Sequence, residues 1–233
     1  MRLAAPAKLT LSLRVTGVRQ DGYHILDSEM VSIDLFDIVE FSTGDGLVVE
    51  GVAASGVSAG PENLVCRALD AVSRSAHVRL EKHIPAGAGL GGGSADAAAV
   101  LRWAGCDDVA VAARLGADVP FCLVGGRARV KGAGELIEQL AFEEEVYTLL
   151  IPPLQVSTPA VYRAWDEMGG PVGESGNDLE PAALVVEPRL AVWRERLGTA
   201  TGQAPRLAGS GATWFVPGSH PGDGRVVVRA CRI

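Results

Sequence analysis

Apolar and polar residues alternate strictly near the start of the chain. In KLTLSLRV, residues 8–15, the apolar positions Leu9, Leu11, Leu13 and Val15 are separated by single polar residues. A period of two residues predicts a β-strand with one face in the core and the other in solvent. The sequence therefore predicts that the fold begins with a half-buried strand.

Strand-like and helix-like segments follow one another along the rest of the chain. Asp21-Gly22 predicts a tight turn after the first strand, because both residues tolerate positive φ. SEMVSIDLFDIVEF, GLVVEGV and HVRLEKHI have strand patterns. PENLVCRALDAVSRSA starts with Pro-Glu and spaces its apolar residues as a helix does, which predicts a helix over about residues 61–75. This mixture, without an internal repeat, predicts a fold of helices and sheets.

A glycine-rich segment, HIPAGAGLGGGSADAAAVL, occupies residues 83–101 and has five glycines between Gly87 and Gly93. An alanine-rich helix is expected directly after it, with Ser94 as its N-cap. Bare backbone lets phosphate oxygens reach N–H groups, and a helix N-terminus adds favourable potential. The segment therefore predicts a phosphate-binding loop and not a ligand-free surface loop. It is not a Walker A loop, because no Gly-Lys-Ser/Thr ends it.

A dinucleotide-binding fold is the alternative interpretation of these glycines. Gly87, Gly89 and Gly92 match G-x-G-x-x-G, and Asp107 lies at the distance of a ribose-binding acid. In that fold, however, the glycines follow a buried strand directly, whereas residues 82–85 intervene here. The context therefore favours the phosphate-binding loop.

Composition and charge limit the class of protein further. With 48% hydrophobic residues among 233, the chain can bury a sizeable core. Its formal net charge of -7 predicts no nucleic-acid partner and no membrane partner, since both attract basic surfaces. Pro6 and Lys8 interrupt the apolar N-terminal stretch, so we expect neither a signal peptide nor a membrane span there. We expect a cytoplasmic protein.

The cysteine pattern favours packing over metal or disulfide chemistry. No C-x-x-C pair is present, and no histidine lies at ligand spacing, so buried apolar thiols are expected. The four cysteines are Cys66, Cys106, Cys122 and Cys231.

The segment PAGAGLGGGSADAA, residues 85–98, resembles the ATP-binding loop of the GHMP kinases. Further segments, in the same order along nearly the whole chain, resemble a branch of this family that acts on a small alcohol with a cytidine diphosphate group. These segments are APAKLTLSLRVTGVRQDGYH, NLVCRA, LGADVPFCLVGGRARVKGAGE, VSTPAVY, NDLEPAA and LAGSGATWF. The resemblance implies an α+β fold with an N-terminal ATP-binding lobe, residues 1–145, and a C-terminal ferredoxin-like lobe, residues 146–233. The active site is expected between the lobes, in a monomer or homodimer.

Two charged residues match the family's catalytic pair. Phosphoryl transfer needs an acidic group near the attacking hydroxyl and a cation near the phosphates. The resemblance gives these roles to Asp118, in LGADVPF, and Lys8, in APAK. Taken singly, Asp118 would be a loop carboxylate capping the turn before Pro120, and Lys8 a solvated strand lysine. Their joint presence favours catalysis.

The resemblance also implies binding sites for ATP and Mg²⁺. Ser94 would help to hold the phosphates or the magnesium ion. The expected ATP-binding residues are Asn63, Leu64, Lys82, Pro85, Gly87, Gly89, Leu90, Gly91, Gly92, Gly93 and Ser94.

On the substrate side, the resemblance implies that Tyr23 and Tyr162 sandwich the cytosine and that His24 contacts it. Flat aromatic faces suit a nucleobase, although each tyrosine alone would pass for ordinary packing. The expected substrate-binding residues are Thr10, Tyr23, His24, Thr158, Tyr162, Gly209 and Ser210.

The chain departs from the family pattern in three places. Thr10 stands where asparagine is usual, Ala95 stands where a second serine is common, and the connection from Trp103 to Leu115 is short. Each departure bears on activity. Two alternatives therefore stay open: a GHMP kinase for another small alcohol, and a nucleotide-binding relative that has lost catalysis.

Overall fold

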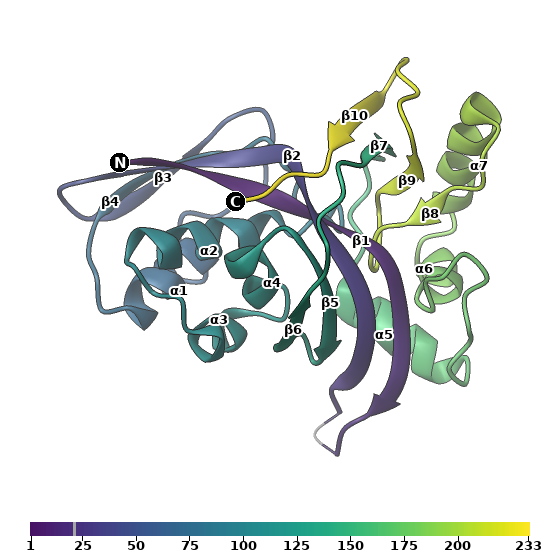
Figure 1. Cartoon of the computed structure of the whole chain (residues 1–233), viewed down its shortest axis with the longest axis horizontal. Helices are drawn as coiled ribbons and strands as arrows, with labels where there is room; N and C mark the ends of the chain where they lie inside the picture. The colour runs from purple at the N-terminus through teal and green to yellow at the C-terminus, as the bar shows by residue number, and fades with distance from the viewer. Residues whose placement is uncertain (21) are drawn as a thin grey trace.

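The computed structural model describes residues 1–20 and 22–233, which form two β-sheets and two groups of helices (Figure 1). Asp21 of the predicted turn lies outside the described residues, whereas Gly22 has the expected positive φ of 84°. The elements in chain order are β1 (Arg2–Val18), β2 (His24–Ser42), β3 (Gly46–Glu50), α1 (Leu64–Ala71), β4 (His77–Glu81), α2 (Gly92–Trp103), α3 (Val109–Leu115), α4 (Val119–Val124), β5 (Arg127–Gly132), β6 (Leu136–Gln139), β7 (Val146–Leu150), α5 (Thr158–Glu167), α6 (Glu180–Val186), α7 (Leu190–Thr201), β8 (Arg206–Leu207), β9 (Trp214–Pro217) and β10 (Arg225–Arg229).

The first sheet is built around the long antiparallel pair β1 and β2, which crosses the molecule from the N-terminus to the hairpin beside α5 (Figure 1). The strand order is β3-β4-β2-β5-β6, with β1 paired to β2. Among the pairs that the structure describes, β3 and β4 alone run parallel. A doubly wound dinucleotide fold needs a mostly parallel sheet. That alternative is therefore wrong, and Asp107 lies in the turn between α2 and α3.

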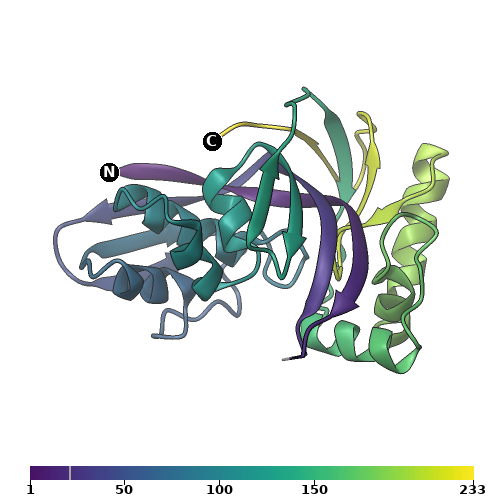
Figure 2. The ribbon, with the colours of Figure 1, turned by 60° about the horizontal axis from the view of Figure 1, so that its bottom comes forward.

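Helices α1 to α4 cover one face of this sheet (Figure 2). Helix α1 is shorter than the predicted range of residues 61–75 at both ends. It begins after Asn63, whose side-chain oxygen accepts a hydrogen bond from Val65 N at 2.9 Å and so caps the helix. The predicted start at Pro61 was wrong because this cap comes two residues later.

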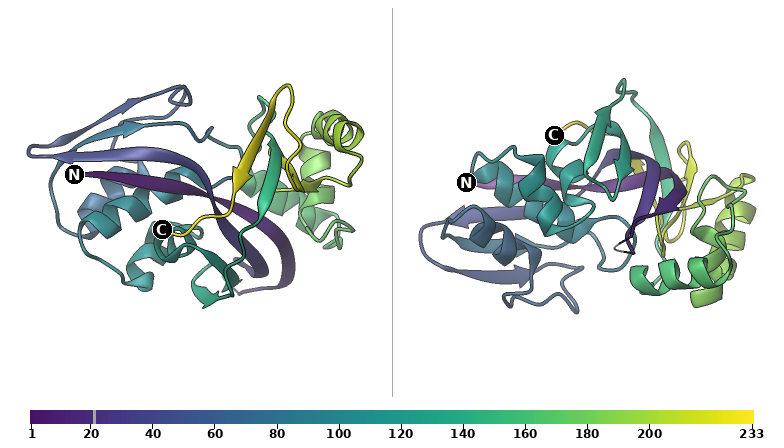
Figure 3. Two further views of the ribbon diagram at one scale, coloured as in Figure 1. Left: turned by 45° about the horizontal axis from the view of Figure 1, so that its top comes forward. Right: turned by 90° about the horizontal axis from the view of Figure 1, so that it is seen from below.

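The second sheet has the order β10-β7-β9-β8 and packs against α5, α6 and α7 (Figure 3). Its first strand begins at Val146. The two sheets also share a core, in which Leu9 and Ile33 of the first sheet meet Leu149 and Phe215 of the second. The division into lobes at residue 145 therefore stays a prediction, since buried contacts join both sides of it.

Strand β1 is buried on both faces from Ala5 to Thr10, so the predicted solvent face is wrong there. Lys8 and Thr10 are only 5% and 2% exposed. The glycine-rich segment covers this face, and Lys8 N donates a hydrogen bond to Leu90 O at 3.0 Å. The strand pattern shows that Lys8 and Thr10 share a face, but it does not show that another segment covers them.

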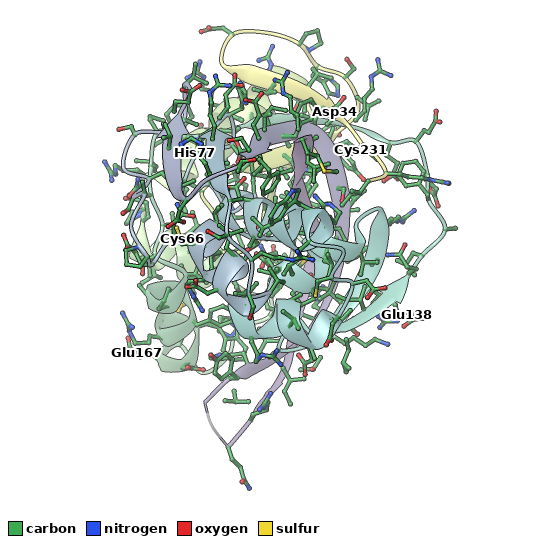
Figure 4. The ribbon with its side chains drawn as sticks, turned by 90° about the vertical axis from the view of Figure 1, so that its left-hand side faces the viewer. Asp34, Cys66, His77, Glu138, Glu167 and Cys231 are labelled. Atoms are coloured by element: carbon green, nitrogen blue, oxygen red, sulfur yellow. The ribbon has the colours of Figure 1, made fainter. Side chains whose placement is uncertain are left out.

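Cys122 is buried as predicted, and burial raises the pKa of its thiol, which keeps it protonated and unreactive. The other cysteines are half-buried. Cys66 on α1 and Cys231 near the C-terminus lie in different parts of the molecule (Figure 4). In the part of the chain that the structure describes, no helix has the length and apolar character needed to cross a membrane.

Candidate active site

One cleft of about 570 Å³ brings together nearly all of the predicted site residues. It lies where β1, the glycine-rich segment, the start of α4 and the turn before β9 meet. Tyr23 and His24 do not belong to its lining. The predicted residues that line it are Lys8, Thr10, Asn63, Leu64, Lys82, Pro85, Gly87, Gly89, Leu90, Gly91, Gly92, Gly93, Ser94, Asp118, Thr158, Tyr162, Gly209 and Ser210.

The glycine-rich segment forms a loop that ends at the N-terminus of α2. Helix α2 is capped by Gly91, and its first hydrogen bond runs from Ala95 N to Gly91 O. Ser94 therefore lies in the first turn of α2, and the prediction that it is the N-cap is wrong. Because the N–H groups of Gly92, Gly93 and Ser94 precede the first helical bond, they are free to bind an anion in the cleft.

Two glycines of this loop are required by protein contacts. A Cβ at Gly89 would lie 2.5 Å from the carbonyl oxygens of Ala208 and Gly211, so the loop packs directly on the turn before β9. At Gly91, φ is +68° and a Cβ would lie 2.8 Å from Lys8 Cγ. Glycine at these positions thus fixes the loop against its neighbours as well as exposing backbone to a phosphate.

Lys8 and Asp118 meet in the cleft as the resemblance implies. Lys8 Nζ lies 3.4 Å from Asp118 Oδ2 and donates a hydrogen bond to Thr10 Oγ1 at 3.0 Å. Asp118 stands at the N-cap of α4, but its side chain makes no capping hydrogen bond. The interpretation of Asp118 as a simple turn cap is therefore wrong. The ammonium and the carboxylate together offer a cation and a proton acceptor at one place.

Thr10 gives the first testable prediction. Because its hydroxyl accepts from Lys8, Thr10→Val removes a contact that orients the ammonium while keeping the shape of the side chain. We expect kcat to fall by about 10-fold or more, as for loss of one hydrogen bond to a charged group. Thr16→Val, at an exposed position of the same strand, is the control. Equal rates for Thr10→Val and the wild type would show that Thr10 does not orient Lys8.

Asn63 and Lys82, which were predicted to bind ATP, have structural partners. The Asn63 side chain caps α1 and also donates to Ser58 O at 2.6 Å. Lys82 is 3% exposed, and its ammonium pairs with Asp37 and with Asp96, the latter at 2.6 Å. Both residues line the cleft, but their polar groups are already engaged.

The sequence interpretation missed Asp37 and Asp96. Burial raises the pKa of Asp96 to about 7, although the Lys82 ammonium opposes this. Each aspartate stands among apolar residues, Asp37 in IDLFDIV and Asp96 in SADAAAV. A charged residue in an otherwise apolar strand or helix was the available signal.

On the substrate side, Tyr162 lines the cleft and His24 lies against it. The two ring centroids are 4.6 Å apart at 36°, and the rings of His24 and Trp165 are nearly perpendicular, with centroids 5.5 Å apart. His24 Nε2 is 2.8 Å from Asp166 Oδ1. Burial, aided by Asp118, raises the pKa of Tyr162, so its hydroxyl stays neutral.

Tyr23, the other tyrosine of the expected sandwich, is 62% exposed, with Arg19 Cζ 6.0 Å from its ring centroid. The structure thus brings His24, and not the Tyr23 side chain, to the half-buried ring of Tyr162. The cytosine sandwich stays a prediction.

The turn before β9 closes the other side of the cleft. Thr158 and Ser210 share a hydrogen bond between their hydroxyls at 2.8 Å. Asn177, which the sequence interpretation did not select, holds this turn by donating to Leu207 O at 2.9 Å and Gly209 O at 2.7 Å. The predicted residues Thr158, Gly209 and Ser210 therefore lie together, next to Lys8.

Comparisons with known proteins agree with this geometry. The family model of the GHMP kinases N terminal domain matches residues 63–126. A 4-diphosphocytidyl-2-C-methyl-D-erythritol kinase of Paracoccus denitrificans is 42% identical, over 92% of this chain and 85% of its own length. The enzyme of the same name from Granulibacter bethesdensis is 38% identical, over 95% and 86%.

Solved structures give the same fold. A crystal structure of 4-(cytidine 5'-diphospho)-2C-methyl-D-erythritol kinase superposes with a TM-score of 0.77 at 31% identity, covering 99% of this chain and 100% of the other. L. major mevalonate kinase matches with a TM-score of 0.70 at 12% identity, covering 100% and 96%, which shows likeness of fold alone.

The two sheets, the loop leading into α2 and the Lys8–Asp118 pair define a kinase of the GHMP class, and the predicted fold class is confirmed. Within that class, the chain belongs to the family of 4-diphosphocytidyl-2-C-methyl-D-erythritol kinases.

Proposed function

We propose that this protein transfers the γ-phosphate of ATP to the 2-hydroxyl of 4-diphosphocytidyl-2-C-methyl-D-erythritol and releases ADP, a step of non-mevalonate isoprenoid precursor synthesis. The observation that carries the proposal is the approach of Lys8 Nζ to Asp118 Oδ2, 3.4 Å, beside the N-terminus of α2. A hydroxyl seated between these groups and a polyphosphate has a proton acceptor on one side and a cation on the other.

Each group has a separate task in this reaction. Asp118 accepts or orients the proton of the attacking hydroxyl, and Lys8 balances the negative charge that gathers on the transferring phosphoryl group. The N–H groups of Gly92, Gly93 and Ser94 hold the phosphates at the positive end of α2. Catalysis then rests on position and charge, as expected for phosphoryl transfer.

Magnesium fits this site together with ATP. No cluster of three acidic, histidine or cysteine side chains that could hold a metal occurs among residues 1–20 and 22–233. The Ser94 hydroxyl, in the first turn of α2 and in the lining of the cleft, is the side chain that would hold Mg²⁺ bound together with the phosphates of ATP. The ion supplies neutralisation of phosphate charge.

The substrate half of the cleft fits an alcohol with an attached nucleobase. Leu13, Leu26 and Met30 of the β1–β2 pair, together with Leu179, give it an apolar wall, and Tyr162 adds an aromatic ring. A flat, largely apolar surface with few polar groups is suited to a base. This end of the cleft is where we expect the cytidine diphosphate group.

A coupled assay of ADP release tests the proposal. ADP should form with the cytidylyl substrate, and much more slowly with homoserine or mevalonate in its place. A preference for either small alcohol would favour a GHMP kinase of other specificity. ATP binding without turnover of any of these substrates would favour the relative that has lost catalysis. The contact between Lys8 and Asp118 argues against that outcome.

Tyr162 provides a test of the cytidine assignment. Loss of one stacking ring is worth about 1 to 2 kcal/mol, so Tyr162→Ala should raise the KM of the cytidylyl substrate by roughly 5- to 30-fold. Tyr162→Phe keeps the ring and should cost little. The KM for ATP should hardly change. An unaltered cytidylyl KM in Tyr162→Ala would contradict stacking on this ring.

Tyr23→Ala is the companion measurement. Tyr23 is 62% exposed and does not line the cleft, so its contact with the base needs a separate test. A sandwich predicts that both alanine variants weaken the cytidylyl substrate. An effect confined to Tyr162→Ala would replace the sandwich by a single ring.

A further inference from the structure

A buried group of charges lies behind the phosphate loop, outside the catalytic pair. It consists of Asp37 on β2, Lys82 just after β4 and Asp96 on α2, which are 0%, 3% and 2% exposed. Burying charges is costly unless they are paired and hydrogen-bonded, and apolar residues in their place often stabilise a core at least as much as a buried ion pair does. The cluster joins three elements at one point, and that point is the base of the loop.

Asp37 makes more of these contacts than either partner. Its Oδ2 accepts from Lys82 Nζ, while its Oδ1 accepts from His83 N and, at 2.8 Å, from Ile84 N. Strand β4 pairs with β2 as far as Glu81, opposite Ile38. Asp37 is the residue of β2 just before Ile38. Its carboxylate accepts hydrogen bonds from the backbone N–H groups that follow β4, at the point where strand pairing ends. This is where the loop begins.

The same cluster reaches the far end of the loop through Lys82. Lys82 Nζ lies 2.6 Å from Asp96 Oδ2, in the second turn of α2. A Cβ at Gly92, the first residue of α2, would lie 3.3 Å from Lys82 Nζ and 3.0 Å from Ile84 Cγ2. Asp37 therefore contacts both ends of the loop. It binds the backbone N–H of Ile84 directly, and it holds the Lys82 ammonium against which Gly92 packs.

We propose that Asp37 is a positioning residue for ATP, which fixes the phosphate loop in its binding conformation before the nucleotide arrives. The inference rests on the proposed use of this loop for ATP. A loop set in advance avoids the cost of ordering on binding, so it favours ATP affinity more than affinity for the second substrate.

Hydrogen-bond accounting separates Asp37 from Asp96. Three donors converge on Asp37, from Lys82, His83 and Ile84, and they occupy both oxygens. An asparagine there must turn its NH₂ toward one set of donors. Asp96 accepts from Lys82 with Oδ2, while its Oδ1 has no hydrogen-bond partner among the described residues. An asparagine at that position can direct its oxygen to Lys82 and its NH₂ to the unused side.

The test compares Asp37→Asn with Asp96→Asn and with Leu197→Ala, a core change on α7 far along the chain from the loop. KM for ATP, KM for the cytidylyl substrate and the urea midpoint are measured for each. We expect Asp37→Asn to raise the KM for ATP by about 10-fold or more and the cytidylyl KM by less than about 2-fold. Asp96→Asn should shift the KM for ATP less. Leu197→Ala should lower the urea midpoint without separating the two KM values.

The proposal is overturned if Asp37→Asn and Asp96→Asn shift the KM for ATP equally. It is also overturned if Asp37→Asn changes both KM values together.

If Asp37→Asn does not fold, hydrogen exchange of backbone amides in the wild-type protein tests the proposal instead. Without nucleotide, the His83 and Ile84 amides should exchange at least about 100-fold more slowly than the amide of the exposed residue Gly56. Fast exchange that becomes slow only on adding ATP would overturn the proposal, because the loop would then be ordered by its ligand. These exchange rates can be measured even if the wild-type protein binds no ATP. Failure of the proposed function is detected separately, by calorimetry with ATP.

Discussion

Asp118→Asn is expected to lower kcat by about 100-fold or more while ATP still binds. The substitution keeps the size and planarity of the side chain but removes a group that can accept a proton. It also weakens the pairing with Lys8 Nζ, which lies 3.4 Å from Asp118 Oδ2. Because the side chain makes no capping hydrogen bond in α4, the fold should survive the change.

The matched control is Asp108→Asn. Asp108 also precedes a short helix, α3, but it is exposed and caps that helix by accepting from Ala110 N at 2.8 Å. Asparagine caps equally well, so this variant should keep the wild-type rate and stability. ATP affinity is measured by calorimetry and kcat by ADP release. An Asp118→Asn enzyme that retains a tenth or more of the wild-type kcat would remove Asp118 from its proposed role.

Local sequence patterns predicted the strands and the loop-to-helix junction well. Hydrophobic alternation and the run from Gly87 to Gly93 depend on neighbours in the chain, and such signals are visible in sequence. The ends of elements were less accurate. Asn63 caps α1 and Gly91 caps α2, whereas the Pro-Glu start and Ser94 had suggested other boundaries. Several residues in a row were acceptable caps, and tertiary contacts decided among them.

The family resemblance predicted the residues of the candidate site, but it did not predict the contacts that these residues make. Lys82 illustrates the difference, because its partner Asp37 is 45 residues away and the pattern of neither segment reveals the other. His24 likewise packs on Tyr162, on a helix far along the chain. Roles that depend on a distant partner therefore required the fold. The covered face of β1 around Lys8 is a further case.

The glycines of the loop have a second role that also depends on distant segments of the chain. In sequence they indicate room for a phosphate, and the backbone N–H groups at the start of α2 agree with that purpose. The structure adds a second constraint, since Gly89 packs on the carbonyls of Ala208 and Gly211 and Gly91 packs on Lys8. The loop proposed to bind ATP is thus also in contact with Lys8, the proposed catalytic lysine. This coupling predicts that a substitution at Gly91 lowers kcat as well as the affinity for ATP.

Gly91→Ala tests that coupling directly, with Gly105→Ala as its matched control. The two glycines flank α2 and have nearly the same φ, +68° and +72°, so alanine costs about 1 to 2 kcal/mol of backbone strain at either one. A Cβ at Gly105 meets nothing within 4 Å, whereas at Gly91 it would lie 2.8 Å from Lys8 Cγ and 3.3 Å from Lys8 Cε.

Both variants should therefore lose stability in a urea titration, Gly91→Ala somewhat more because of its contact with Lys8, and only Gly91→Ala should lose activity. We expect its kcat to fall by about 100-fold, because displacing the ammonium by about 1 Å from Thr10 and Asp118 misaligns the cation with the transferring phosphate. The KM for ATP should rise as well, since Gly91 caps the helix proposed to receive the phosphates. Equal activities in the two variants would mean that strain alone matters, and that the loop does not position Lys8.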